Sequence, residues 1–168
     1  ADYYVSVGKA GTIKSQEGDQ RTPLGVYYIT SNLDTKVLNE FYGAGAMPLN
    51  YPNILDIKRG KSGSGIWLHG TPSAQYSRAP EATDGCVVLS NPEMENLLTL
   101  SGWRMTPVII ADKLDWIPAG QKPAAYADFK PRLDQWLSDR QGADADRLKT
   151  HYSPRFERDA LDLEHWWP

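Results

Sequence analysis

The sequence predicts a mainly β domain with peripheral helices, followed by a helical C-terminal extension. Its apolar residues form short runs of strand length, and 14 glycines and 12 prolines are available to end these runs. Beyond residue 118 the composition becomes polar, and one apolar stripe at helical spacing remains, formed by Phe129, Leu133, Trp136 and Leu137. We therefore expect one domain over residues 1–117, and over residues 118–168 a linker and helical extension that begins a truncated second domain.

Composition excludes several classes of function. The net charge is −3 over 168 residues, so no basic surface for nucleic acid is expected. No apolar stretch approaches the length of a membrane span. One cysteine permits no internal disulfide, so the cysteine count does not identify the redox compartment. Ala1 leads directly into an apolar run, without a signal peptide, so we expect a trimmed N-terminus.

In the first third of the chain, apolar alternation and turn residues predict two strands and a short helix. The strands cover residues 2–7 and 24–30, the second after Thr22 and Pro23. The helix covers residues 34–41, with Asn32 or Asp34 as its cap. Residues 43–53 read as a loop over the functional site.

Further strands are predicted on both sides of a long loop. Residues 54–58 alternate as a strand, and residues 65–68 and 86–89 read as buried strands joined by the loop 71–83. A helix then begins after Ser90 or Asn91 and ends near residue 101, with Glu93 able to close a capping box on Ser90. Residues 107–111 supply the last strand.

Cys86 and His69 are the candidate nucleophile and base. A free thiol has a pKa of about 8.5 and attacks only as the thiolate, so a nearby group must accept its proton. His69 ends one predicted strand and Cys86 opens the other, so the two side chains meet if the strands are neighbours. Gly85 permits close approach of a substrate, and the N–H groups of Asp84, Gly85 and Cys86 could converge on an oxyanion.

Two other interpretations of these residues remain open. A lone cysteine in an apolar run is usually a small buried hydrophobe, and a lone histidine is more often structural. His69, Asp84 and Cys86 also have the chemistry of metal ligands, although the paired spacings typical of cysteine-rich zinc sites are absent. We expect no metal and no other cofactor.

The blocks HGT at residues 69–71 and TDGCVVLSN at residues 83–91 resemble the signature of L,D-transpeptidase catalytic domains of the YkuD type. Residues 21–27 are similar to the TP-x-G strand entry of that family, and the resemblance extends over residues 1–117. Two departures are Asp84, where the family usually has histidine, and Val88, where it often has arginine or asparagine. By this resemblance the loop 43–53 is a lid, and Tyr51, Gly70 and Thr71 are substrate-binding candidates.

The resemblance implies acyl transfer on peptidoglycan stem peptides. Cys86 would attack the third-residue carbonyl of a tetrapeptide stem and expel D-alanine, as an L,D-transpeptidase or an L,D-carboxypeptidase of a cell-shape pathway. It also implies a periplasmic or otherwise exported protein. Residues 129–156 faintly resemble the opening helices of nuclear transport factor two-like domains. The alternatives are an idle cell-wall binding module and a metal-dependent hydrolase using His69, Asp84 and Cys86.

Overall fold

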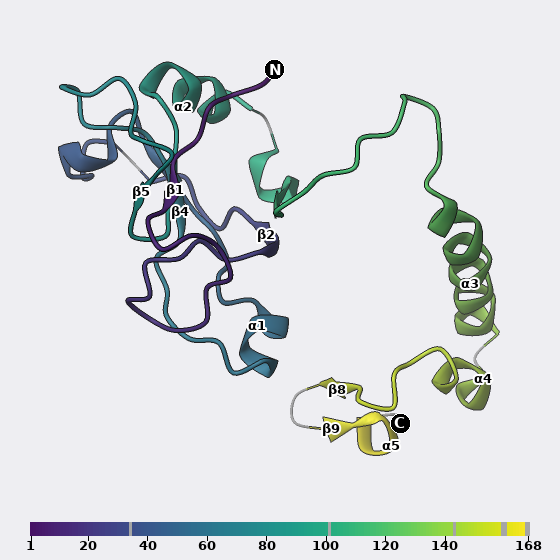
Figure 1. The fold of residues 1–168 in the computed structure, drawn as a ribbon. Helices are drawn as coiled ribbons and strands as arrows, with labels where there is room; N and C mark the ends of the chain where they lie inside the picture. Colours follow the sequence, from purple (N-terminus) through teal and green to yellow (C-terminus); the bar gives the residue numbers. More distant parts are fainter. Residues whose placement is uncertain (34, 101, 143, 159–160, 167–168) are drawn as a thin grey trace. The chain divides into compact units, whose positions relative to one another are not determined.

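The computed structural model describes residues 1–33, 35–100, 102–142, 144–158 and 161–166. The chain divides into two units, Ala1–Leu114 and Asp115–Pro168, which Figure 1 shows in purple to green and in green to yellow. Each unit is described by itself below. Among the helices in the described ranges, none is both long and apolar enough to cross a membrane.

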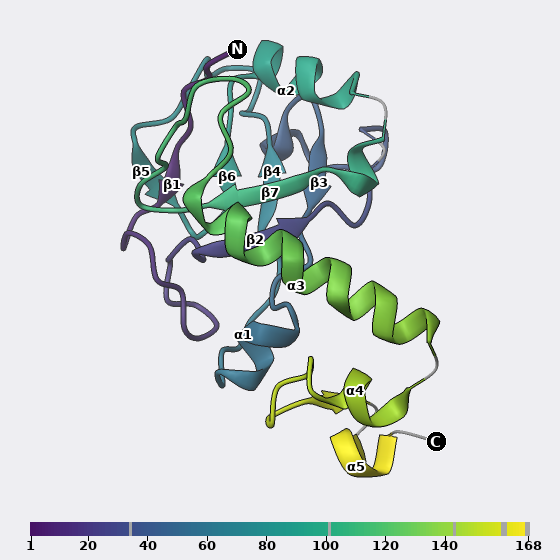
Figure 2. The ribbon, with the colours of Figure 1, turned by 90° about the vertical axis from the view of Figure 1, so that its right-hand side faces the viewer.

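A three-stranded sheet lies at the centre of the first unit. Strand β4 (Trp67–His69) pairs antiparallel with β3 (Ala46–Pro48) on one side and parallel with β6 (Val87–Val88) on the other. Figure 2 shows β4 between these two strands. The predicted strands that end at His69 and begin at Cys86 are therefore direct neighbours.

Two strand pairs complete the frame of this unit. Strand β1 (Val7–Gly8) pairs parallel with β5 (Glu81–Thr83), and β2 (Gly25–Tyr28) pairs antiparallel with β7 (Pro107–Ile110). A bridge between Ser6 and Val88 joins the start of β1 to β6. The first-unit strands expected near residues 5, 24, 65, 86 and 107 are thus present, each shorter than predicted.

Alternation along β2 places its side chains as the sequence predicts. Tyr27 is completely buried, whereas Tyr28 is 46% exposed on the opposite face. The ring of Tyr27 packs edge-on against Tyr51, within a core that also contains Met47, Leu68 and Met94. Burial of these large apolar side chains holds the short strands together.

Helix α2 (Asn91–Leu98) begins where the sequence predicts. Ser90 accepts a hydrogen bond from the Glu93 N–H, and the Glu93 carboxylate accepts one from the Ser90 N–H, which closes the predicted capping box. The helix ends at Leu98, earlier than predicted, and residue 101 lies outside the described residues.

The predicted strand over residues 54–58 is wrong, because this segment is helix α1 (Ile54–Lys58). The Asn53 side chain accepts hydrogen bonds from the Leu55 and Asp56 N–H groups, and Asp56 accepts one from the Asn53 N–H. Asp56 is buried and paired with Lys61 at 2.9 Å. This capping box outweighs the apolar alternation from which the strand was predicted.

Two predictions before α1 are also corrected. Residues 35–38 form turns, and the helical segment here is a single 3-10 turn, η1 (Glu40–Tyr42), capped by Asn39. Asp34, a predicted cap, lies outside the described residues. The expected loop 43–53 contains β3, whose Ala46 and Met47 are buried in the core, because small and apolar residues here fill the space beside β4.

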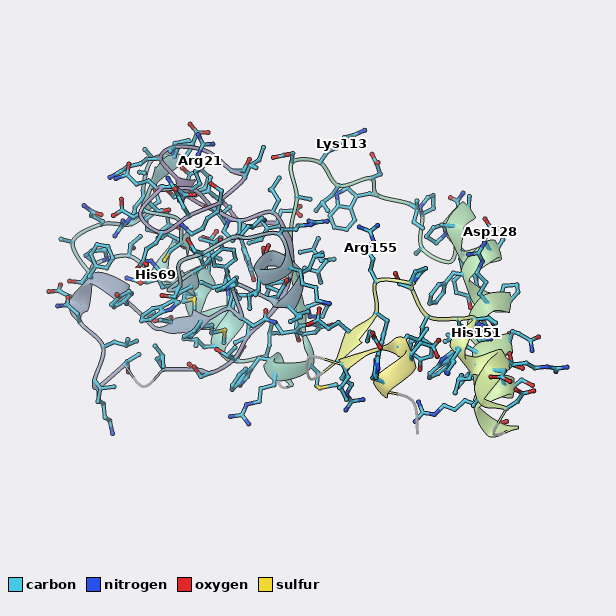
Figure 3. All side chains as sticks on the ribbon, turned by 90° about the horizontal axis from the view of Figure 1, so that it is seen from below. Arg21, His69, Lys113, Asp128, His151 and Arg155 are labelled. Atoms are coloured by element: carbon cyan, nitrogen blue, oxygen red, sulfur yellow. The ribbon has the colours of Figure 1, made fainter. Side chains whose placement is uncertain are left out.

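The second unit begins with helix α3 (Ala124–Gln141), as predicted for the polar tail. It continues through α4 (Ala145–Lys149), a hairpin of β8 (Glu157–Arg158) and β9 (Leu161–Asp162), and α5 (Leu163–Trp166). His151 lies against α3, 2.7 Å from the Asp139 carboxylate (Figure 3). Among the residues that the structure describes, 28% are helical and 19% are in strands, so the mainly β prediction holds only loosely.

Candidate active site

The register of β4 and β6 brings the two candidate catalytic residues to the same part of the sheet. Leu68 is the partner of Val87, and His69 is the partner of Val88. One further step along this register places Cys86 beside Trp67, two residues before His69. Paired and alternate residues of parallel strands face the same side of a sheet, so both side chains share one face.

His69 is buried at the end of β4, and the backbone of the next residue orients its ring. Its Nδ1–H donates to the Gly70 carbonyl oxygen at 2.7 Å, which leaves Nε2 as the proton acceptor. The rings of Phe41 and Tyr42 lie 5.8 and 5.2 Å from the imidazole. Burial lowers the pKa of His69 from 6.5 to about 4, with a smaller contribution from Arg78. The imidazole is therefore neutral at pH 7, as a general base must be.

The Cys86 thiol is partly exposed and lies 3.3 Å from the Gly65 carbonyl oxygen, to which it donates. Burial raises the pKa of this thiol, and the carboxylate of Asp84 acts in the same direction. The Trp67 backbone and the charge of Arg78 oppose that rise. The resting side chain is therefore a thiol that needs a base to become a nucleophile.

Gly85 is fixed in a conformation that only glycine adopts without strain. Its φ is +128°, and a Cβ atom there would lie 2.7 Å from the Arg21 carbonyl oxygen. The Gly85 N–H donates to the Thr83 hydroxyl at 3.1 Å in the resting site, and its role as an oxyanion donor stays a prediction. The Gly85 carbonyl accepts from buried Thr22, the threonine of the TP-x-G block.

The side chain of Asp84 points toward solvent and pairs with Lys9. The carboxylate is 78% exposed and lies 2.8 Å from Lys9 Nζ. Orientation of His69 is supplied by the Gly70 carbonyl, and no hydrogen bond joins Asp84 to His69 among the described residues. In the same described ranges no group of three or more His, Cys, Asp or Glu side chains could hold a metal ion. The metal-site hypothesis for His69, Asp84 and Cys86 therefore gains no support.

Gly70 and Thr71 are buried at the start of the loop that follows His69. A Cβ atom on Gly70 would lie 2.3 Å from Asn91 Oδ1. Thr71 is completely buried, and its hydroxyl donates to the Gln75 carbonyl oxygen at 2.7 Å. Both residues hold the loop that follows His69, and their contact with substrate stays a prediction.

Tyr51 is a core residue in this structure. It is 5% exposed, and its hydroxyl donates to the Ser62 carbonyl oxygen at 3.1 Å. Burial raises its pKa to about 12. Its packing in the core explains its position, and its contact with substrate stays a prediction that no exposed surface supports.

A cleft of about 630 Å³ lies next to η1 and the loop after Thr71. Its walls are formed by Phe41, Pro72, Gln75, Ser77, Arg78, Ala79 and Ala82. The Phe41 ring connects this cleft to the catalytic residues, since it lies 5.8 Å from the His69 imidazole and 4.5 Å from the Arg78 guanidinium. Sequence analysis missed Phe41 and Arg78, because neither belongs to a motif; Phe41 lies in the 3-10 turn η1 and Arg78 in the loop before β5.

Comparisons with known proteins show the family to which this chain is similar. A family model described as the L,D-transpeptidase catalytic domain (YkuD) matches residues 1–110. The chain is similar to the structure of Bd1075 from Bdellovibrio bacteriovorus, with 28% identity, a TM-score of 0.77, and coverage of 98% of this chain and 57% of that one. No curated protein matches the chain.

A second similar structure is that of the helical cell shape determining protein Pgp2 from Campylobacter jejuni. The identity is 28% and the TM-score 0.70, with 95% of this chain and 55% of that one covered. The chain thus spans a little more than half the length of both solved structures.

Proposed function

This chain belongs to the YkuD family of L,D-transpeptidase catalytic domains, and from this premise we propose that it carries out cysteine-dependent acyl transfer on peptidoglycan stem peptides. Cys86 is the nucleophile and His69 is the general base. The substrate is a tetrapeptide stem, attacked at the carbonyl of its third residue. Peptidoglycan is thus the proposed partner, and the catalytic residues require no cofactor.

The observation that carries the proposal is the state of His69. Its Nδ1–H is held by Gly70, and its low pKa keeps Nε2 unprotonated at neutral pH, on the strand beside Cys86. A thiol whose pKa is raised cannot attack unaided at pH 7, whereas a neutral imidazole facing the same region accepts its proton. A binding module without catalytic activity would not need a neutral imidazole and a thiol on neighbouring strands.

The chemical steps follow from these two groups. His69 Nε2 takes the thiol proton as Cys86 Sγ bonds to the carbonyl carbon, and the carbonyl oxygen becomes an oxyanion. The Cys86 N–H is our candidate oxyanion donor, since the Gly85 N–H is taken by Thr83. As the C–N bond breaks, protonated His69 returns the proton to the leaving amine of D-alanine, and a thioester remains on Cys86.

The acceptor decides between the two activities of the proposal. Water hydrolyses the thioester and gives an L,D-carboxypeptidase, whereas an amine from a second stem gives an L,D-transpeptidase. The likeness to a cell shape determining protein supports a role in cell shape for this chain as well. The substrate places the protein outside the cytoplasmic membrane, in the periplasm or another exported location.

Mass analysis of purified stem tetrapeptide, incubated with the protein alone and with an acceptor amine, tests the proposal. Release of D-alanine to leave a tripeptide identifies the carboxypeptidase, and a cross-linked or amine-exchanged product identifies the transpeptidase. Cys86→Ser should lower turnover by more than about 100-fold, since an unactivated hydroxyl is a poor nucleophile. Unchanged tetrapeptide in both incubations, with a thiol that reacts with iodoacetamide, would instead favour the binding module.

A further inference from the structure

Arg78 has a guanidinium without an anionic partner beside the candidate active site. Its Nε is buried and makes no hydrogen bond, and no carboxylate in the described part of the chain pairs with the group. The guanidinium lies 4.5 Å over the Phe41 ring. Its backbone carbonyl is held by the Tyr4 hydroxyl at 2.7 Å. An arginine anchored in this way, with a free donor, is suited to a ligand that is absent from the chain.

Arg78 also lies close to the proposed chemistry. Its charge acts on the pKa of both His69 and Cys86, lowering each. The Phe41 ring, which it covers, lies 5.8 Å from the His69 ring. Arg78 and Phe41 together form part of the wall of the 630 Å³ cleft. A ligand that contacts the guanidinium in that cleft therefore lies beside the Phe41 ring, which in turn contacts His69.

We propose that Arg78 binds the C-terminal carboxylate of the stem peptide and so restricts attack by Cys86 to the last peptide bond. The ligand chemistry follows from the donor, because the planar guanidinium fork matches a carboxylate with two parallel hydrogen bonds. The terminal carboxylate is only one residue, about 3.8 Å, beyond the scissile carbonyl. This assignment rests on the proposed function. It identifies the Arg78 guanidinium as the group that makes the enzyme an exopeptidase.

Electrostatics favour an anion at this position. The groups on which the charge of Arg78 acts, the Cys86 thiol and the His69 imidazole, are neutral in the resting site, so they do not neutralise the positive charge. Burial of the Nε donor without a hydrogen bond costs free energy in the free enzyme. A carboxylate bound by the guanidinium supplies a negative charge next to it, so part of the binding free energy is gained only with a substrate that has a free C-terminus.

The first test compares tetrapeptides that end in a carboxylate or in a carboxamide. Wild type should cleave the acid with a kcat/KM roughly tenfold or more above that of the amide, the effect of a hydrogen bond to a charged group. Arg78→Gln should remove this preference, and Arg78→Lys should restore part of it through charge alone. A preference that is the same in wild type and Arg78→Gln overturns the proposal.

A third peptide tests the other carboxylate source. If the third residue carries a side-chain carboxylate, amidating that group should leave the effect of Arg78→Gln intact. The assignment to the terminal carboxylate is overturned if amidating the side chain removes the effect of Arg78→Gln while the peptide with a C-terminal amide is cleaved normally. Arg104→Gln is the matched control, because this arginine also stacks on an aromatic ring, at 4.9 Å from Trp103, and does not line the cleft.

The second test does not need peptidase activity. Iodoacetate and iodoacetamide alkylate the same thiolate with loss of iodide, and they differ by one carboxylate. The rate of Cys86 alkylation by iodoacetate, divided by the rate with iodoacetamide, should fall by about two- to fivefold in Arg78→Gln and stay unchanged in Arg104→Gln. Any general change in the thiol's pKa cancels in this ratio.

The two tests separate the proposals. If no peptide is cleaved by wild type while the alkylation ratio still falls in Arg78→Gln, the anion site stands and the acyl-transfer function fails. If peptides are cleaved and the ratio does not change, Arg78 does not attract an anion to Cys86 and the inference fails. Thermal unfolding of both arginine variants confirms that each is folded before either result is interpreted.

Discussion

Asn91 binds the backbone of Thr71 through both ends of its side-chain amide. Its Nδ2 donates to the Thr71 carbonyl oxygen at 2.9 Å, and its Oδ1 accepts from the Thr71 N–H at 3.1 Å. The same Oδ1 accepts from the Ala44 N–H at 2.9 Å. One side chain at the start of α2 thus fixes both the loop after His69 and the segment before β3.

Asn91→Ala should therefore disturb the site without removing a catalytic group. Loss of three hydrogen bonds, two of them to otherwise unpaired N–H groups, should destabilise the fold by about 2–3 kcal/mol. Because the Gly70 carbonyl that orients His69 belongs to the same loop, kcat should fall more than KM rises. Urea unfolding and steady-state kinetics measure the two effects. Asn96→Ala, at an exposed position of the same helix, is the control, and equal effects of the two substitutions would contradict this role.

Gly85→Ala should destabilise the protein because it combines positive φ with a backbone clash. The added Cβ would meet the Arg21 carbonyl oxygen at 2.7 Å and Ile66 at 3.1 Å, so the loop beside Cys86 must shift. We expect a loss of about 2–4 kcal/mol in urea unfolding. Gly60→Ala has a φ of +71° but open space around it, so it should cost only about 1 kcal/mol. A similar cost at both positions would show that the clash is relieved without consequence.

His69 should make the stability of the fold depend on pH in a defined window. Its pKa is 6.5 when unfolded and about 4 when folded, so the unfolded state binds more protons between these values. The contribution of neutral His69 to the free energy of unfolding is complete above pH 6.5 and is lost as the pH falls toward 4, with about 2 kcal/mol lost at pH 5. Urea unfolding at pH 7.5 and pH 5 should show this slope in wild type and a smaller one in His69→Gln. An imidazole that titrates near 6.5 by NMR in the folded protein would contradict the prediction.

Asp84→Asn should change the thiol only slightly. The carboxylate is exposed and paired with Lys9, and its effect on the pKa of Cys86 is smaller than those of burial, Trp67 and Arg78. Removing its charge should lower the thiol pKa by less than about one unit, measured by iodoacetamide alkylation against pH. Activity should fall less than in Cys86→Ser. A drop of one unit or more would mean that the carboxylate faces the sulfur in solution.

Local features of the sequence predicted the parts of the fold that depend on neighbours in the chain. Ser90 and Glu93 form the capping box at the spacing read from the sequence, because both partners lie within one helical turn. Tyr27 and Tyr28 take opposite faces because alternation is a property of any strand. The sequence also predicted the two strands that end at His69 and begin at Cys86, but it left open whether they are neighbours, which the register of β4 and β6 shows.

Only the tertiary structure decided how the site is held and charged. The helix at residues 54–58 is different, because its capping box between Asn53 and Asp56 is a local signal that the prediction from alternation overlooked. The contacts of Asn91 with Thr71, and of Arg78 with Phe41, join residues at least 20 positions apart. Hydrogen bonds and ring contacts of this kind arise when strands pair and loops pack, and no periodicity in the chain encodes them. The sequence thus determined the chemistry available at Cys86 and His69, and packing determined their protonation and what surrounds them.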